Sequence, residues 1–159
     1  MGAESLYNGA MYPLFRARAI IVRDNCIALI KRQRDGRIYY VIPGGGMEMG
    51  ETPEQTAIRE SREELGLHIE VDRLLAEINF HGRRQYYFLA RVTGGKFGTG
   101  EGPEMMGRYP PERGTYTPVW IPLRSVEHVN LFPPSIAEIV IQAARRGWPA
   151  EKVEINIEN

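Results

Sequence analysis

The segment from Gly45 to Leu67 constrains this chain more than any other, because it gathers three glutamates in one predicted helix. Glu63 and Glu64 follow Glu60 by three and four residues, so both are its neighbours on one helical face, about 5 to 6 Å away at Cβ. Like charges at this spacing oppose folding by roughly 0.2 to 0.5 kcal/mol per pair. A bound dication such as Mg²⁺, which prefers oxygen ligands, would reverse that effect. The segment therefore predicts a metal-binding helix, with a solvated face of ordinary salt bridges as the alternative.

The two ends of this helix carry residues that favour helix termini. Thr52 supplies a hydroxyl N-cap, Pro53 suits the first helical position, and Gln55 can complete a capping box. Gly66 is a typical residue for the position after the last turn. The sequence therefore predicts a helix over 53–65. Its predicted inner stripe consists of Ala57, Ile58, Ser61 and Leu65.

Eight positions across this segment fit the pattern G-x5-E-x7-R-E-U-x-E-E-x-G-U, in which U is an aliphatic residue. They are Gly45, Glu51, Arg59, Glu60, Glu63, Glu64, Gly66 and Leu67. In this pattern the chain resembles the Nudix hydrolases. With each of the seven fixed letters at a frequency of roughly 7%, one window would match by chance on the order of 10⁻⁸ of the time. Only Ser61 departs from the pattern, and its hydroxyl could bond the carbonyl of residue 57 instead.

The resemblance implies an α/β fold: a Nudix-type α/β/α sandwich with a mixed sheet, in which the catalytic loop and helix follow the third strand. It also implies hydrolysis of a nucleoside diphosphate linked to another moiety, with Mg²⁺ or Mn²⁺ as cofactor. Water attack on phosphorus needs neutralised phosphate oxygens and an aligned nucleophile, and metal ions supply both. Nucleoside triphosphates, dinucleoside polyphosphates and nucleotide sugars stay open as substrates. The proline that many ADP-ribose hydrolases carry near residue 82 is absent, as is a coenzyme A signature.

Carried over by position, the resemblance also assigns metal ligands. Glu60 and Glu64 would bind the metal directly, and Glu63 would bind it directly or through water. The Gly45 carbonyl would add a ligand from the loop before the helix. The residues implied to brace that loop against the helix are Glu51 and Arg59.

A general base is expected from a loop distant in sequence. Residues 93–114 are rich in glycine and proline and too long for a casual connection, so we expect a substrate-covering loop, with a mobile segment as the alternative. We rank Glu112 first among its glutamates, because family members can carry such a residue just before the strand predicted at 115–123. The alternatives are Glu101, Glu104 and, on the helix, Glu63. The catalytic candidates are therefore Glu63, Glu64 and Glu112.

The rest of the chain reads mainly as strands. Three short runs are expected to form an antiparallel meander, and two longer ones a hairpin closed at His81 and Gly82. The predicted strands are 19–22, 26–32, 38–42, 71–80, 83–92 and 115–123, with an edge strand at 153–157. A second amphipathic helix is predicted over 135–146.

Substrate recognition is expected from arginines and tyrosines on these strands, which could bind phosphate or stack on a base. The candidates are Arg32, Tyr39, Arg83, Arg84 and Tyr86. Because side chains alternate along a strand, at most one of Tyr39 and Tyr40 should line a pocket, and the same rule holds for Tyr86 and Tyr87. Ordinary packing is the alternative for each aromatic ring.

Length and composition suit one domain over 1–159, in which 1–15 could form a peripheral arm. Lys and Arg number 20 and Asp and Glu also number 20, so no overall field recruits a long nucleic acid or a membrane. The lone Cys26 excludes an internal disulfide and suits a reducing compartment. Because the N-terminus lacks a signal sequence, we expect a cytoplasmic location.

Three functions follow from these observations. The complete glutamate set favours a hydrolase acting on a small nucleotide. A catalytically silent Nudix-fold domain that senses nucleotides is the alternative, and Ser61 and the unassigned base leave room for it. An enzyme acting on capped RNA is disfavoured, because the chain lacks a basic extension. A homodimer is compatible with the family.

Overall fold

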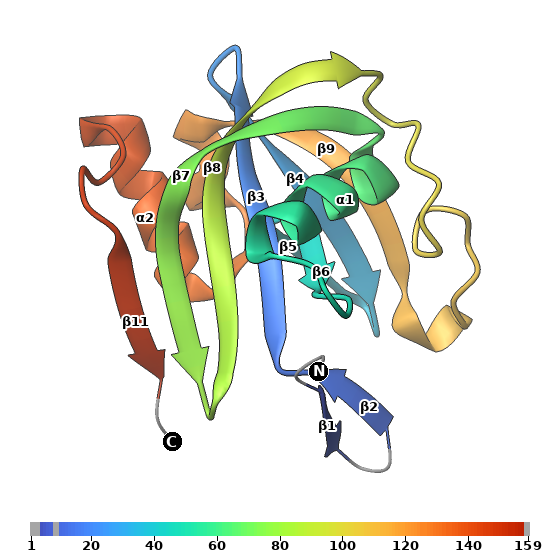
Figure 1. Ribbon diagram of the computed structural model, residues 1–159. Helices are drawn as coiled ribbons and strands as arrows, with labels where there is room; N and C mark the ends of the chain where they lie inside the picture. Colours follow the sequence, from blue (N-terminus) through green and yellow to red (C-terminus); the bar gives the residue numbers. More distant parts are fainter. Residues whose placement is uncertain (1–3, 8–9, 158–159) are drawn as a thin grey trace.

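The computed structural model describes residues 4–7 and 10–157, with side chains from Leu14 onward. Its helices and strands follow one another along the chain as in Figure 1. They are β1 (Glu4–Tyr7), β2 (Ala10–Pro13), β3 (Phe15–Arg23), β4 (Cys26–Arg34), β5 (Arg37–Val41), β6 (Gly44–Gly46), α1 (Pro53–Leu65), β7 (Leu67–Phe80), β8 (Arg83–Gly95), the 3-10 turn η1 (Pro111–Arg113), β9 (Thr115–Pro122), the 3-10 turn η2 (Leu123–His128), β10 (Leu131–Phe132), α2 (Pro134–Arg146) and β11 (Val153–Ile157).

The main sheet is mixed, as predicted. Its strands run in the order β10-β5-β4-β3-β8-β7-β11, while β6 pairs with β3 and β9 pairs with β4. The pairs β3–β8, β7–β11 and β5–β10 are parallel, and the others are antiparallel. β3 and β4 stay paired only at Val22–Ile27 and Arg23–Cys26 and then diverge. Beyond that point β6 lies beside β3, and β5 lies beside β4. β1 and β2 form a separate two-stranded sheet within the predicted arm.

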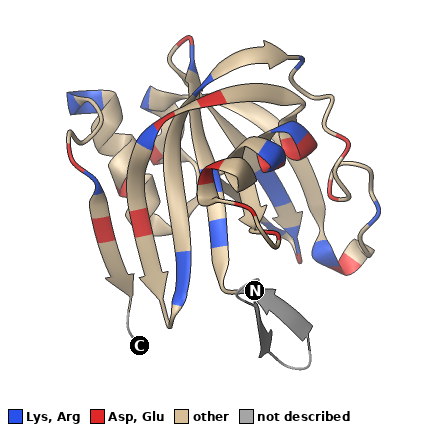
Figure 2. Ribbon diagram, in the orientation of Figure 1, with Lys and Arg blue, Asp and Glu red and all other residues tan. Residues whose placement is uncertain are grey.

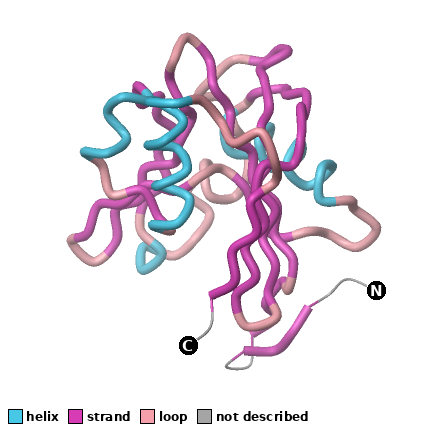
Figure 3. Tube along the Cα trace, turned by 90° about the vertical axis from the view of Figure 1, so that its left-hand side faces the viewer, coloured by secondary structure: helices cyan, strands magenta, loops and turns pink. Residues whose placement is uncertain are grey.

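The two helices cover opposite faces of this sheet, which gives the predicted α/β/α layers. Figure 3 shows α2 on one side of the strands and α1 on the other. Alternate residues of β3 separate the two cores: Ile20 packs toward α2, and Ile21 packs toward α1. Burial of these apolar side chains, at about 25 cal/mol per Å², is the main force that holds the layers together. The fully buried residues on the α2 side include Ile20, Ile27, Leu29, Ile42, Leu75, Val126, Ile136 and Val140, and those on the α1 side include Ala17, Ala19, Ile21, Ala28, Ala57 and Leu65.

The helix that carries the three glutamates begins and ends as the sequence predicts. The Thr52 hydroxyl accepts a hydrogen bond from the Gln55 amide at 3.1 Å, and the Gln55 side chain accepts one from the Thr52 amide at 2.9 Å. This is a complete capping box. Gly66 ends the helix with a φ of 76°, in the left-handed region that favours glycine. The position of α1 is therefore fixed locally at both ends.

The predicted inner stripe of α1 is wrong at one position. Ile58 is 40% exposed, whereas Ala57, Ser61 and Leu65 are buried. The helical period turns Ile58 outward and brings Glu60 and Glu64 onto the buried face in its place. The expected bond of Ser61 is confirmed, since its hydroxyl donates to the Ala57 carbonyl at 2.8 Å.

The other predicted strands and the second helix form, whereas the strands β6 and β10 and the turns η1 and η2 were not predicted. The hairpin of β7 and β8, the strand β9, the edge strand β11 and the helix α2 all form as predicted. The segment Gly44–Gly46, expected as a loop, forms the short strand β6 opposite Arg16–Arg18. α1 and α2 have 13 residues each, and within the described ranges no helix is long and apolar enough to cross a membrane.

Candidate active site

Two glutamates of α1 point into the molecule. Glu60 and Glu64 are each only 7% exposed and share a helical face with the core residues Ala57 and Leu65. α1 lies against β3 and β6, and Figure 2 shows acidic and basic residues interspersed along this helix. Burial of a carboxylate is costly unless a cation or hydrogen-bond donors compensate it. The two side chains therefore need a cation, hydrogen-bond donors or a proton to offset their burial.

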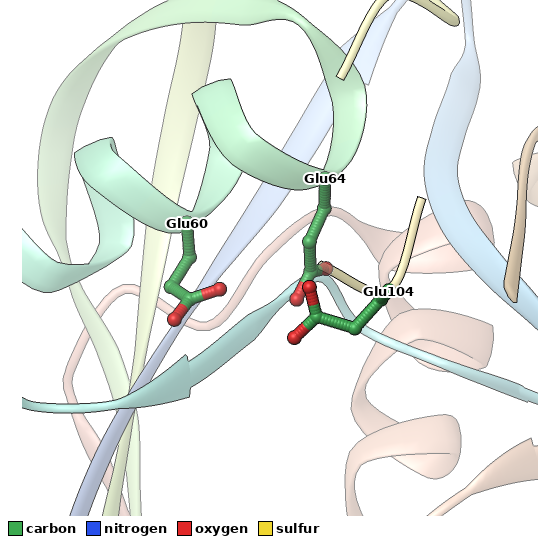
Figure 4. A group of neighbouring side chains, drawn as sticks. All are labelled: Glu60, Glu64 and Glu104. Carbon is green, nitrogen blue, oxygen red and sulfur yellow. The ribbon is translucent and has the colours of Figure 1, made fainter. Parts of the chain in front are cut away.

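A third carboxylate reaches the pair from the long loop between β8 and η1. One oxygen from each of Glu60, Glu64 and Glu104 lies within 4.8 Å of the others, and Figure 4 shows the three side chains converging. Glu60 Oε2 and Glu104 Oε2 are buried and have no hydrogen-bond partner within the described part of the chain. Convergent carboxylates with free lone pairs are what Mg²⁺ and Mn²⁺ prefer. These three residues, called the carboxylate cluster below, therefore fit a divalent cation.

Burial and mutual repulsion make Glu60 and Glu64 hold protons more tightly than free carboxylates do. Burial raises the pKa of Glu64 well above its usual value, and the neighbouring Glu60 charge raises it further. Burial also raises the pKa of Glu60, where the Arg59 charge acts in the opposite direction. A cation that binds here must displace those protons, so metal and proton compete for the same oxygens.

Arg59 connects the cluster to the loop before α1. Its Nε donates to Glu51 Oε2 at 2.8 Å and its Nη2 to the Gly46 carbonyl at 3.0 Å. Its Nη1 donates to Glu60 Oε1 and to Glu63 Oε2, both at 3.1 Å. The bond from Arg59 lowers the pKa of Glu51 to about 2. Burial disfavours the charged form of Arg59 and acts to lower its pKa. The hydrogen bond with Glu51 and the charges of the nearby glutamates outweigh this effect, so the pKa of Arg59 is raised. The guanidinium thus orients Glu60 through a partly buried network of hydrogen bonds and ion pairs.

The glycine strand β6 lets backbone approach the cluster closely. Gly45 is buried and pairs with Ala17, and a Cβ at Gly45 would lie 2.5 Å from Glu60 Oε1. Any side chain there would therefore displace Glu60. The neighbouring Gly44 amide donates to Glu64 Oε2 at 3.3 Å. β6 supplies both the space and one of the donors that the buried carboxylates need.

The other catalytic candidates lie outside the carboxylate cluster. The Glu63 side chain is 37% exposed and pairs with Arg59 instead. Glu112, which the sequence ranks first as the distal base, is exposed on η1, and Glu101 is also exposed. The structure thus places Glu104, rather than Glu112, beside Glu60 and Glu64.

Backbone hydrogen bonds between the loop and α1 explain the position of Glu104. The Gly98 amide donates to the Leu65 carbonyl at 2.9 Å, and the Gly102 amide donates to the Glu63 carbonyl at 2.8 Å. The loop therefore satisfies carbonyls that the end of a helix leaves without partners. The spaced glycines at 98, 100 and 102 are the sequence signal that could have pointed to this docking.

The predicted substrate residues separate into two groups. Arg32 and Tyr39 lie on the α1 side of the sheet, and Tyr86 packs at the edge of the core on that side. Tyr40 and Tyr87 face the α2 core, so the alternation rule holds. The other predicted residues, Arg83 and Arg84, lie at the start of β8. There Arg84 lines a small hollow with Asn79 and Asn156, near the β11 edge.

Comparison with known proteins assigns the chain to a family. The family model described as NUDIX domain matches residues 13–142. An ADP-ribose pyrophosphatase of Methanocaldococcus jannaschii is 33% identical over 102 residues, which are 60% of each chain. The 8-oxo-dGDP phosphatase NUDT18 of Homo sapiens is 38% identical over 74 residues, 46% of this chain and 23% of that protein. The matches therefore span less than two thirds of these curated relatives.

The fold likewise has a counterpart among solved structures. The crystal structure of an ADP-ribose pyrophosphatase from Streptococcus suis superimposes with a TM-score of 0.61 and covers 88% of this chain and 97% of that one. Its sequence identity is 20%, so the similarity concerns the fold alone.

Proposed function

The chain belongs to the Nudix family, and from this premise we propose that it is a metal-dependent hydrolase of small nucleotides. The bond cleaved is a phosphoanhydride in a nucleoside diphosphate linked to another moiety, and water attacks phosphorus. The observation that carries this proposal is the carboxylate cluster, with the buried Glu60 Oε2 lacking a partner. A nucleotide-sensing domain without turnover has less need of two buried glutamates beside a half-buried third, because burial of a carboxylate costs stability.

Glu60, Glu64 and the Gly45 carbonyl are the groups that would hold Mg²⁺ or Mn²⁺, with Glu63 bound directly or through water. Such an ion, when bound, neutralises phosphate oxygens and acidifies water. Arg59 keeps Glu60 and Glu63 oriented, and Glu51 keeps Arg59 oriented, through the hydrogen bonds described above.

We assign the general base to Glu104 rather than to Glu112. A base must lie within hydrogen-bond reach of the water that it deprotonates. Glu104 reaches the cluster and has a buried oxygen, Oε2, without a partner among the described residues, whereas Glu112 is exposed. Its carboxylate can accept the proton of the attacking water.

The substrate is proposed to be a nucleoside diphosphate derivative. The matched relatives carry the names ADP-ribose pyrophosphatase and 8-oxo-dGDP phosphatase. Both names describe a nucleotide with a phosphoanhydride. Nucleotide sugars, nucleoside triphosphates and dinucleoside polyphosphates have the same bond and fall within the proposal. A balanced surface charge suits such small partners, and a cytoplasmic homodimer is compatible with it.

A panel of nucleotides incubated with Mg²⁺ or Mn²⁺ tests this function. We expect phosphate-containing products from at least one of them, and we expect Glu64→Gln to lose activity by more than 100-fold while it keeps its circular dichroism spectrum. Tight nucleotide binding without any product, unaltered in the Glu64→Gln variant, would instead support the sensing domain.

A further inference from the structure

Three side chains on adjacent strands form a stack on the α1 face of the sheet. Arg32 on β4 lies directly opposite Tyr39 on β5 and Tyr116 on β9. The Arg32 guanidinium carbon is 3.7 Å from the centre of the Tyr116 ring and 5.7 Å from the centre of the Tyr39 ring. Cation–π contacts of this kind hold planar groups face to face. The stack is therefore ordered before any ligand arrives.

The end of the long loop extends this stack. The Tyr109 ring lies 6.2 Å from the Tyr116 ring at an interplanar angle of 49°, and the Arg113 guanidinium carbon lies 4.0 Å from the Tyr109 ring. Three tyrosine rings and two guanidinium groups thus follow one another in one row. We call this row the tyrosine–arginine ladder. Its members are Tyr39, Arg32, Tyr116, Tyr109 and Arg113.

The positive charges of the ladder are not neutralised within the protein. Arg32 donates from Nε to the Thr115 carbonyl at 3.1 Å and from Nη2 to the Arg113 carbonyl. Among the described residues, neither Arg32 nor Arg113 has a carboxylate within 4.0 Å, whereas Arg91 has two. Two backbone carbonyls therefore fix the plane of the Arg32 guanidinium and leave its charge available to a ligand.

The ladder lies on the same face as the carboxylate cluster and is connected to it. Met105, which follows Glu104, packs against the same core cluster as Tyr116. The connection also runs through β5, which ends at Val41, and on to Pro43, four residues after Tyr39. The next residue, Gly44, donates to Glu64. A nucleotide whose diphosphate lies at the cluster would extend its ribose and base toward the ladder.

We propose that the tyrosine–arginine ladder binds the nucleobase of the substrate by stacking. This inference rests on the proposed function, because it takes the ligand to be a nucleotide. Bases stack on tyrosine rings and on guanidinium planes largely independently of their hydrogen-bonding edges, since every base has a π face. The ladder therefore selects for a planar base and favours the larger face of a purine.

Calorimetry at saturating Mg²⁺ tests the ladder with two probes: a nucleoside diphosphate with a methylene bridge, and methylenediphosphonate, which lacks a base. We expect Arg32→Lys and Tyr116→Leu each to weaken binding of the nucleoside probe by roughly 5- to 150-fold. Binding of the base-free probe should not change. Tyr116→Phe, which keeps the ring, should bind as wild type does.

The matched control is Arg34→Lys, the same change two residues further along β4, at an exposed arginine outside the ladder. It should leave both probes unaffected. The ladder is refuted if Arg32→Lys and Tyr116→Leu bind the nucleoside probe normally, or if both probes weaken equally. Nucleotide hydrolysis, assayed separately, distinguishes this failure from failure of the proposed function. Base-dependent binding without turnover would support base stacking on the ladder and contradict the proposed hydrolase activity.

Discussion

Replacement of Gly100 by alanine should release Glu104 from the carboxylate cluster without altering any carboxylate. A Cβ at Gly100 would lie 2.6 Å from the carbonyl carbon of Glu64 and 2.7 Å from its oxygen, and it would also overlap the Glu63 carbonyl. All of these are backbone atoms of α1, which cannot rotate away. The loop must therefore move off the helix, and Glu104 moves with it.

The size of the effect follows from the bonds that this movement breaks. The loop is held by the Gly98 amide on the Leu65 carbonyl at 2.9 Å and by the Gly102 amide on the Glu63 carbonyl at 2.8 Å. Each bond contributes about 0.5 to 1.5 kcal/mol net, so the docked loop loses about 1 to 3 kcal/mol. The ratio of docked to undocked loop then falls roughly 5- to 150-fold.

Hydrogen exchange at the Gly98 and Gly102 amides measures this ratio directly. Gly100→Ala should speed exchange at both amides and weaken Mn²⁺ binding. Gly94→Ala is the matched control, because a Cβ there meets His68 at an ordinary 3.5 Å. Gly102→Ala, with its closest contact at 3.0 Å, should be intermediate. Exchange and Mn²⁺ affinity in Gly100→Ala equal to those in Gly94→Ala would refute the reasoning.

Three further predictions follow from the same network. Glu104→Gln should weaken Mn²⁺ binding at least tenfold by calorimetry, whereas Glu101→Gln, an exposed neighbour in the loop, should not. Equal effects would contradict the place of Glu104 in the carboxylate cluster. Because the pKa values of Glu60 and Glu64 are raised, Mn²⁺ binding should release protons above pH 4.5, and Mn²⁺ affinity should increase as pH rises. Calorimetry in buffers of different ionisation enthalpy measures the number of protons released. Binding without proton release would contradict the raised pKa values. Glu51→Gln should cost about 1.5 to 3 kcal/mol, or roughly 3 to 12 °C in thermal unfolding near neutral pH. The folded pKa of Glu51 is lowered to about 2, so wild type should lose this advantage as pH falls from 4.5 toward 2; an advantage that persists at pH 2 would contradict the ion pair with Arg59.

Features set by neighbouring residues in the chain could be predicted from the sequence. The capping box of Thr52 and Gln55 and the glycine end at Gly66 depend only on adjacent groups, and α1 follows them. The hairpin of β7 and β8 is likewise local, since His81 and Gly82 close it with positive φ. Strand alternation correctly separates Tyr39 from Tyr40 for the same reason.

Features that depend on distant pairing could not be predicted in this way. Gly44–Gly46 becomes a strand only because it pairs with Arg16–Arg18 of β3, at the edge that opens where β3 and β4 diverge. The buried face of α1 carries Glu60 and Glu64 in place of Ile58, against the hydrophobic pattern, as expected where function overrides stability. Glu104 could not be ranked above Glu112, because backbone bonds to α1, rather than side-chain pattern, fix the loop.

Anomalous diffraction from crystals soaked in Mn²⁺ tests the central claim most directly. The account predicts a manganese peak within about 2.0 to 2.6 Å of carboxylate oxygens of Glu60 and Glu64, with Glu104 on the same side. Saturating Mn²⁺ that leaves these oxygens without a peak, or that binds only elsewhere on the chain, would contradict it.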